Sequence, residues 1–424
     1  MNYQETLKYI HSVSWEFCKP GLERITELTQ KLDCPQDSLR FIHVAGTNGK
    51  GSFCSMLDSV LRAAGYKVGL FTSPYISFFN ERMCIDGIPI SDDELAEITS
   101  QVRPIADAMT DKPTEFELIT AIALEYFRKN KVDIVIFEAG MGGRLDSTNV
   151  ISTPILSVIT GIALDHTAFL GDTVEKIAAE KAGIIKHKVP VLWGGEDEAA
   201  LAVIEAKARE MSSRLYKTDH STLRITSADL DSSLFDYGEY KDMRIRLLGL
   251  YQPKNAANVL AAIDALTDSG MQIGEDAIRE GLCRAEWHAR FELLSREPVV
   301  IYDGAHNPQG IDMLVKSVRK YFGEKKIILV STVMGDKDYE SMVSDLSSVT
   351  ESAYIFKVND RALATDAYVD VYRREGVRAY ACESMSEALS CAIAEGKEID
   401  APIICAGSLY MYAEAEAALR TIQE

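Results

Sequence analysis

The sequence lacks long apolar runs, paired cysteines and repeats. No run reaches about 18 apolar residues and the first eleven residues contain no apolar run, so we expect neither a membrane span nor a secretion signal. The eight cysteines are scattered without a C-x-x-C pair, which disfavours a zinc ribbon or a thioredoxin-type site. We therefore expect reduced, mostly buried thiols in a cytoplasmic protein.

Positive charge is also in deficit. Lys and Arg number 45 against 64 Asp and Glu, a net charge of −19, which argues against non-specific binding to nucleic acid. An anionic small substrate is not excluded, because a local basic pocket can exist on an acidic protein. The composition, 47% hydrophobic and 26% charged, is typical of a globular protein, and 424 residues favour two domains. We expect a monomer.

Short apolar runs alternate with helical patterns in the first part of the chain. The predicted strands span residues 40–45, 68–71, 133–138 and 155–159, and the predicted helices span 52–64, 114–129, 173–185 and 196–211. Thr114, followed three residues later by Glu117, is a capping-box signature at the start of one helix. This alternation predicts a mostly parallel sheet with right-handed crossovers.

The rhythm breaks over residues 214–248, where short segments suggest a small antiparallel sheet, and helices resume over 252–283. Residues 290–298 resemble a hinge, and a new α/β series follows with a first strand at 299–302 and a helix at 308–322. We predict an α/β fold with a P-loop-type N-terminal domain, residues 1–296, and a smaller Rossmann-like domain, residues 297–424.

The most informative stretch is H-V-A-G-T-N-G-K-G-S, residues 43–52. A strand, a Gly-rich turn and a helix form the context of a phosphate-binding loop, and Lys50 can reach the phosphates. The Walker pattern nevertheless places a metal-binding hydroxyl directly after the Lys, whereas Gly51 stands there and Ser52 comes one residue late. An ordinary Gly-rich turn is the alternative, and the Lys, the Gly spacing and the flanks argue against it.

Polar residues follow three other predicted strands. Glu138 ends one strand before a Gly-rich loop, Asp165 and His166 follow the next, and Asp303 and His306 follow the first strand of the second domain. Ligands of open parallel sheets lie at the carboxyl ends of strands, and a carboxylate there suits Mg²⁺. A solvated Glu, a capping His and a polar turn are the respective alternatives. Periodicity does not decide whether Glu180 or Lys181 enters a site.

The order and spacing of these motifs identify a family. The chain resembles folylpolyglutamate and dihydrofolate synthases of the Mur ligase superfamily through H-V-A-G-T-N-G-K-G-S, T-S-P, F-N-E-R, E-A-G-M-G-G-R-L-D-S-T-N, L-D-H, E-K-A-G-I-I-K, Q-P-K-N-A-A-N and D-G-A-H-N-P. It departs at Tyr75, where relatives often carry His, and at Ala289, where they usually carry Gly.

The resemblance implies a set of site residues. The implied metal ligands are Ser73, Glu138, His166 and a carbamoylated Lys181, and the implied catalytic residues are Lys50, His166 and Lys181. ATP would contact Thr47, Asn48, Gly49, Lys50, Gly51, Ser52, Asn255, Arg290, Asp303 and His306, in the cleft between the domains. Folate would contact Phe79, Asn80, Glu81, Arg82, Phe116 and Asp146.

The implied reaction is an ATP-driven ligation of L-glutamate to a folate through an acyl phosphate, with ATP as co-substrate, two Mg²⁺ ions and a monovalent cation. The pterin substrate stays open between dihydropteroate and tetrahydrofolate. There are three alternative functions. A cell-wall Mur ligase acting on UDP-linked substrates is disfavoured by F-N-E-R and G-K-G-S. A kinase or regulatory NTPase leaves D-G-A-H-N-P unexplained, and a non-catalytic folate-binding protein leaves the metal and phosphate groups unexplained.

Overall fold

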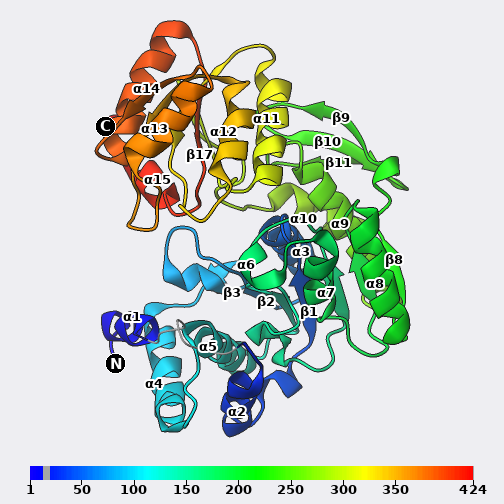
Figure 1. Cartoon of the computed structure of the whole chain (residues 1–424). Coiled ribbons are helices and arrows are strands. Elements are labelled where there is room, and N and C mark those ends of the chain that lie inside the picture. Colours follow the sequence, from blue (N-terminus) through cyan, green and yellow to red (C-terminus); the bar gives the residue numbers. More distant parts are fainter. Residues whose placement is uncertain (13–19, 424) are drawn as a thin grey trace. The chain divides into compact units, whose positions relative to one another are not determined.

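A computed structural model describes residues 1–12 and 20–423. Contacts divide the chain into two compact units, one of residues 1–223 and 255–285 and one of residues 224–254 and 286–424 (Figure 1). Each unit is built on its own sheet, which confirms the predicted α/β class. The assignment of residues 1–296 to an ATP-binding domain and of residues 297–424 to a glutamate ligase domain stays a prediction.

The first unit contains an eight-stranded sheet in the order β4-β3-β2-β5-β1-β6-β7-β8. Six strands run parallel, and β3 and β4 add an antiparallel edge. The strands are β1 (Phe41–Ala45), β2 (Val68–Phe71), β3 (Met83–Ile85), β4 (Ile88–Pro89), β5 (Ile134–Glu138), β6 (Leu156–Ile159), β7 (Val191–Trp193) and β8 (Leu215–Lys217). The four strands predicted in this unit are confirmed.

Helices of the first unit follow the predicted crossovers, with additions. They are α1 (Tyr3–His11), α2 (Glu23–Lys31), α3 (Lys50–Ala63), α4 (Asp92–Ala108), α5 (Glu115–Asn130), α6 (Thr167–Leu170), α7 (Val174–Ala182), α8 (Glu198–Glu210), α9 (Gln252–Asp268, whose first three residues belong to the second unit) and α10 (Glu275–Arg284), with 3₁₀ turns η1 (Pro35–Ser38), η2 (Phe79–Arg82), η3 (Ser147–Val150) and η4 (His220–Thr222). Thr114 and Glu117 form the predicted capping box of α5. No described helix is long and apolar enough to cross a membrane.

The second unit contains a six-stranded sheet in the order β12-β13-β17-β14-β15-β16, parallel except at β12. Its strands are β12 (Glu292–Arg296), β13 (Val299–Asp303), β14 (Ile327–Ser331), β15 (Thr350–Ile355), β16 (Arg378–Ala381) and β17 (Ile403–Ala406). Its helices are α11 (Pro308–Phe322), α12 (Tyr339–Ser347), α13 (Thr365–Arg374), α14 (Met385–Ile399) and α15 (Tyr412–Gln423). The predicted Rossmann-like pattern is confirmed.

Two irregular segments also belong to the second unit. The predicted small antiparallel sheet is confirmed as β9 (Arg224–Ala228), β10 (Ser233–Tyr237) and β11 (Tyr240–Ile245). The hinge predicted at residues 290–298 is wrong, because β12 pairs antiparallel with β13 across the Glu297–Pro298 turn. The segment predicted to be a hinge is therefore a strand and the turn of a hairpin.

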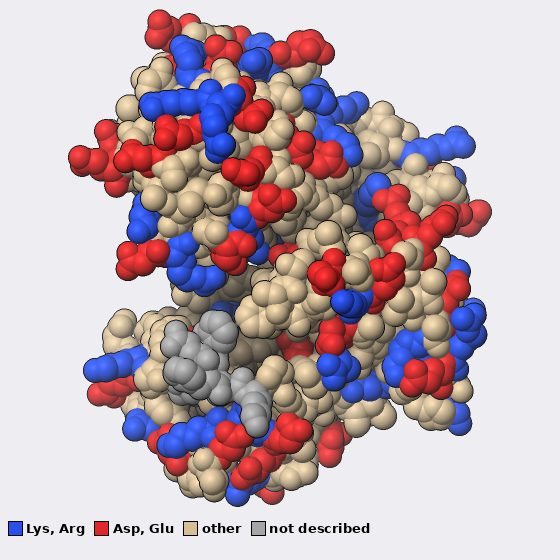
Figure 2. Space-filling model, viewed as in Figure 1, with Lys and Arg blue, Asp and Glu red and all other residues tan. Residues whose placement is uncertain are grey.

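The thiol prediction holds only in part. The seven cysteines that the structure describes are free, as expected, whereas Cys18 lies outside the described residues. Of these seven, Cys54, Cys84 and Cys405 are buried and the other four are not, so the expectation of mostly buried thiols is wrong. Acidic and basic side chains are interspersed on the face seen in Figure 2.

Candidate active site

The phosphate-binding loop connects β1 to α3 and is fastened to the segment that follows β6. The Thr47 amide donates to the Gly161 carbonyl at 2.8 Å, and the Thr160 hydroxyl donates to the Asn48 carbonyl at 2.8 Å. The Thr47 hydroxyl also lies 3.1 Å from the Ala163 amide, which donates to it. Because β1 and β6 are adjacent parallel strands, their following loops share one edge of the sheet.

Gly49 is required by two features of this loop. Its φ of +85° lies in the left-handed region, where a side chain is strained. A Cβ there would also lie 2.6 Å from Oδ1 of Asn255. The loop thus passes close to α9, and Asn255 is placed against the start of α3, where Lys50 is the first helical residue.

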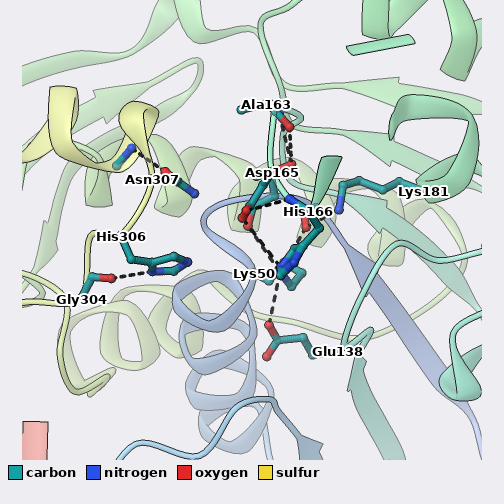
Figure 3. Close-up of polar contacts among 12 residues, drawn as sticks. Lys50, Glu138, Ala163, Asp165, His166, Lys181, Gly304, His306 and Asn307 are labelled. Atoms are coloured by element: carbon teal, nitrogen blue, oxygen red, sulfur yellow. Dashed lines mark hydrogen bonds and ion pairs between the residues drawn. The ribbon is translucent and has the colours of Figure 1, made fainter. Parts of the chain in front are cut away.

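Lys50, Glu138 and Ser73 come together at the carboxyl ends of three parallel strands. Lys50 Nζ lies 3.1 Å from the Gly46 carbonyl and 3.9 Å from Glu138 Oε1 (Figure 3). The Ser73 amide donates to Glu138 Oε2 at 3.3 Å. Glu138 is only 3% exposed, so its carboxylate is held in a low-dielectric setting beside a cation.

Lys181, not Glu180, faces the phosphate-binding loop. Lys181 is 4% exposed and its Nζ donates to the Gly46 carbonyl at 2.7 Å, whereas Glu180 pairs with Arg144 at 2.8 Å. Burial, with the charge of Lys50 as a second cause, lowers the pKa of Lys181 from 10.5 to about 7. A substantial share of this amine is therefore neutral near pH 7.

His166 lies on the neighbouring loop, at the start of α6 with a φ of +49°. Its amide donates to Asp165 Oδ1 at 2.9 Å, and its Nε2 lies 3.9 Å from Asp165 Oδ2. Among the described residues, no three His, Cys, Asp or Glu side chains are close enough to hold a metal ion by themselves. Asp165 also places a carboxylate at this edge, although the sequence did not lead us to predict it as a metal ligand.

The F-N-E-R segment forms η2 and is firmly packed. Asn80 donates to the Ile90 carbonyl at 2.7 Å and accepts from the Tyr3 hydroxyl of α1 at 2.9 Å. Glu81 accepts two backbone amides, and the Arg82 guanidinium lies 5.1 Å from the centre of the Tyr75 ring. Phe79 and Asn80 are buried, so these residues shape the adjoining surface rather than form it.

Phe116 and Asp146 flank the loop that follows β5. A Cβ on Gly140 would lie 2.6 Å from Phe116 Cζ and 3.3 Å from Asp146 Oδ2. Asp146 accepts from the Met141 amide at 2.8 Å and from Thr148 at 2.6 Å. Burial raises the pKa of Asp146, while these hydrogen bonds oppose that shift.

Large apolar side chains are exposed on the loops that follow β2, β5 and β6 and on the short helix α6. Sequence reasoning missed this set, although an apolar residue in a loop at a carboxyl-end edge is a usable signal. Its members and exposures are Tyr75 at 37%, Phe78 at 49%, Met141 at 43%, Leu164 at 52% and Phe169 at 63%. They offer apolar surface beside the charged groups already described.

The D-G-A-H-N-P motif of the second unit is equally ordered. The buried Asp303 carboxylate accepts from the Tyr251 hydroxyl at 2.7 Å and from the Ala305 amide at 2.8 Å. His306 Nδ1 lies 2.8 Å from the Gly304 carbonyl, so Nδ1 carries the proton and donates. Arg290 lies against Gly304, where a Cβ would come within 2.4 Å of its guanidinium.

Ala289, where members of the resembled family usually carry Gly, has an unusual backbone conformation. Ala289 has a φ of +58°, a conformation that glycine adopts more readily. The alanine therefore adds local strain beside Arg290 without changing a proposed ligand. The ATP contacts predicted for Arg290, Asp303 and His306 stay predictions.

Two family models match the chain: the Mur ligase middle domain over residues 44–266 and the Mur ligase, glutamate ligase domain over residues 289–409. The dihydrofolate synthase/folylpolyglutamate synthase of Bacillus subtilis is 40% identical over 86% of this chain and 88% of its own. The folylpolyglutamate synthase of Lacticaseibacillus casei is 38% identical over 97% of both chains. A crystal structure of Mycobacterium tuberculosis folylpolyglutamate synthase complexed with ADP and AMPPCP has a TM-score of 0.88 at 29% identity, covering 99% of each chain.

Proposed function

The chain belongs to the folylpolyglutamate and dihydrofolate synthases within the Mur ligase superfamily. We therefore propose that the sheet edge with Lys50, Glu138 and Lys181 is where this chain carries out the family's reaction. The activity is ATP-dependent ligation of glutamate to a folate, with ATP as co-substrate. The observation that carries the site assignment is the convergence of these three side chains around the phosphate-binding loop.

The proposed reaction has two steps. An oxygen of the folate carboxylate attacks the γ-phosphorus of ATP, ADP leaves, and an acyl phosphate forms. The glutamate amine then attacks the acyl carbon, phosphate leaves and the amine loses a proton. Lys50 and the amides at the start of α3 neutralise charge on the transferring phosphoryl group, which is how phosphoryl transfer is mainly accelerated.

Glu138, the Ser73 hydroxyl and His166 would hold Mg²⁺. The donor set fits, because Mg²⁺ binds through one or two carboxylates and completes its shell with phosphate oxygens and water. When bound, the ion would neutralise charge on the phosphates. This arrangement answers why Gly51 can replace the usual hydroxyl: the proposed ligands come from the loops after β2, β5 and β6. Ser52 is then a phosphate contact near the helix start.

The folate would lie on the apolar side of this edge. Tyr75, Phe78 and Met141 provide exposed apolar and aromatic surface, which suits a flat pterin and an aminobenzoyl ring. Phe116 and the F-N-E-R segment would fix the shape of that surface. Asn255, Arg290, Asp303 and His306 would contact the nucleotide.

Oxygen transfer tests the proposed acyl phosphate. We expect a folate labelled with ¹⁸O in its carboxylate to deliver one label to the released phosphate for each amide formed. The measurement is mass spectrometry of phosphate after a single turnover. Unlabelled phosphate alongside normal product would contradict the acyl-phosphate step.

Lys181 carries a further prediction, its conversion to a carbamate. The neutral amine attacks CO₂ and loses a proton, and a pKa of about 7 leaves roughly half of Lys181 neutral at pH 7, against well under 1% of an ordinary lysine. The product is an oxygen donor suited to Mg²⁺.

With ¹³C-bicarbonate we expect one carbamate resonance that strengthens as pH rises from about 6 to 8 and is absent in Lys181→Met. The control is Lys176→Ala on the same helix, because Lys176 is exposed and its pKa is raised by Asp172. A resonance that survives in Lys181→Met would overturn the assignment.

A further inference from the structure

His43 opens the phosphate-binding stretch, and the proposed mechanism gives it no role. It is fully buried in β1, between the central strands β5 and β6. Among the described residues its Nδ1 has no hydrogen-bond partner, and burial, with the charge of Lys186 as a second cause, lowers the pKa of His43 to about 3. An aliphatic residue would fill this position at lower cost, since burying a half-satisfied imidazole is unfavourable.

The other ring nitrogen supplies the reason for a histidine. His43 Nε2 lies 2.9 Å from the Thr148 hydroxyl, and that hydroxyl donates to Asp146 Oδ1 at 2.6 Å. A threonine hydroxyl has a single proton, so with that proton directed to Asp146 it must accept from His43. The neutral ring therefore carries its proton on Nε2.

Asp146 connects the hydrogen-bonded pair of His43 and Thr148 to the loop after β5. Its Oδ2 accepts from the Met141 amide at 2.8 Å, and its Oδ1 also accepts from the Thr148 amide at 3.0 Å. The loop held in this way runs against Phe116 at Gly140 and exposes Met141. It also begins directly after Glu138.

We propose that His43 is a positioning residue for the folate: through Thr148 and Asp146 it fixes the loop of residues 139–142, and thereby the surface formed by Phe116 and Met141. The inference rests on the proposed placement of the folate at this loop. His43 does not touch substrate, and it acts only by fixing the direction of one hydroxyl proton. In a buried chain of this kind, hydrogen bonds are stronger than in water and reinforce one another, so the loss of one donor weakens the next bond.

The residues on either side of Thr148 also support a positioning role. Ser147 lies 2.7 Å from the Thr120 hydroxyl of α5, and Thr120 donates to the Phe116 carbonyl at 2.7 Å. Asn149 donates to the Gly183 carbonyl at the end of α7 at 3.2 Å. The turn η3 thus ties β1, α5 and α7 to one loop, and His43 provides its link to the central strand.

The test compares two pairs of variants. Thr148→Val removes the hydroxyl at nearly constant shape and Thr148→Ser restores it, while His43→Leu removes the donor and His43→Gln restores one. We expect Thr148→Val and His43→Leu to raise the KM for the folate about tenfold, with the KM for ATP unchanged. The double variant should be no worse than either single one, because both break the same chain. Thr148→Ser and His43→Gln should lie near wild type.

A second measurement tests the positioning role of His43 separately from the proposed function. Hydrogen exchange of the Met141 and Thr148 amides should accelerate in Thr148→Val and His43→Leu, whether or not the protein turns over a folate. Thr29→Val is the control, because the hydrogen bonds of the buried Thr29 hydroxyl to described residues stay within α2. Variants that lower the melting temperature but leave folate KM and amide protection at wild-type values would overturn the inference. An inactive wild type with altered exchange in the variants would instead refute the proposed function alone.

Discussion

Lys50→Ala is expected to lower kcat for glutamate ligation by about a thousandfold, the scale on which a cation at a transferring phosphoryl group contributes. Lys50 Nζ is held at the mouth of the phosphate-binding loop by the Gly46 carbonyl and by Glu138. Its charge is therefore available where negative charge develops on the phosphate oxygens. Steady-state release of ADP with saturating folate, glutamate and ATP measures the effect.

The fold should survive this change. Lys50 is the first residue of α3 and its side chain is partly exposed, so its removal empties no core position. Lys67→Ala is the matched control, because Lys67 donates to the Asn130 carbonyl just before β2 begins, at the opposite end of that strand from Ser73. A folded Lys50→Ala enzyme with near-normal turnover would remove Lys50 from the mechanism.

Glu138→Gln is expected to lower kcat at least a hundredfold and to raise the Mg²⁺ concentration needed for half-maximal rate. The amide keeps the size of the side chain and one acceptor oxygen for the Ser73 amide, but it loses the charge that a hard cation requires. The loss should shrink when Mg²⁺ is raised, whereas a fold defect would not respond to the ion. Titration of activity with Mg²⁺ at fixed ATP measures both quantities.

A buried glutamate outside the site provides the comparison. Glu125 is 9% exposed on α5 and pairs with Arg128, so Glu125→Gln removes a similar charge without touching the sheet edge. It should leave the Mg²⁺ dependence unchanged. If Glu138→Gln and Glu125→Gln shift the Mg²⁺ titration equally, Glu138 is not a ligand.

The strands that position the site could be predicted because each is a short, mostly apolar run that leads into a loop containing Gly or polar residues. Residues 40–45 and 133–138 are of this kind, and their parallel pairing follows from the helices between them. Short or polar elements gave no such signal. β4 spans Ile88–Pro89 only, and β16 has three exposed residues among Arg378–Ala381. β12 lies in the segment that was predicted to be a hinge, so it was missed as a strand.

Side-chain direction was the part of the site that periodicity could not supply. Glu180 and Lys181 are adjacent in sequence, and only the packing of α7 turns Lys181 toward Gly46 and Glu180 toward Arg144. His43 and Thr148 are 105 residues apart, so their hydrogen bond has no local signature. Both residues belong to the sequence motifs that identify the family. Their contact, however, depends on η3 folding back onto β1.

The most direct test of the central claim is glutamate- and ATP-dependent release of ADP, run separately with dihydropteroate, with tetrahydrofolate and with a UDP-muramyl peptide. The site described here predicts release with at least one of the two pterins, strict dependence on L-glutamate and none with the UDP-linked substrate. Release with the UDP-muramyl peptide and with neither pterin would contradict the account.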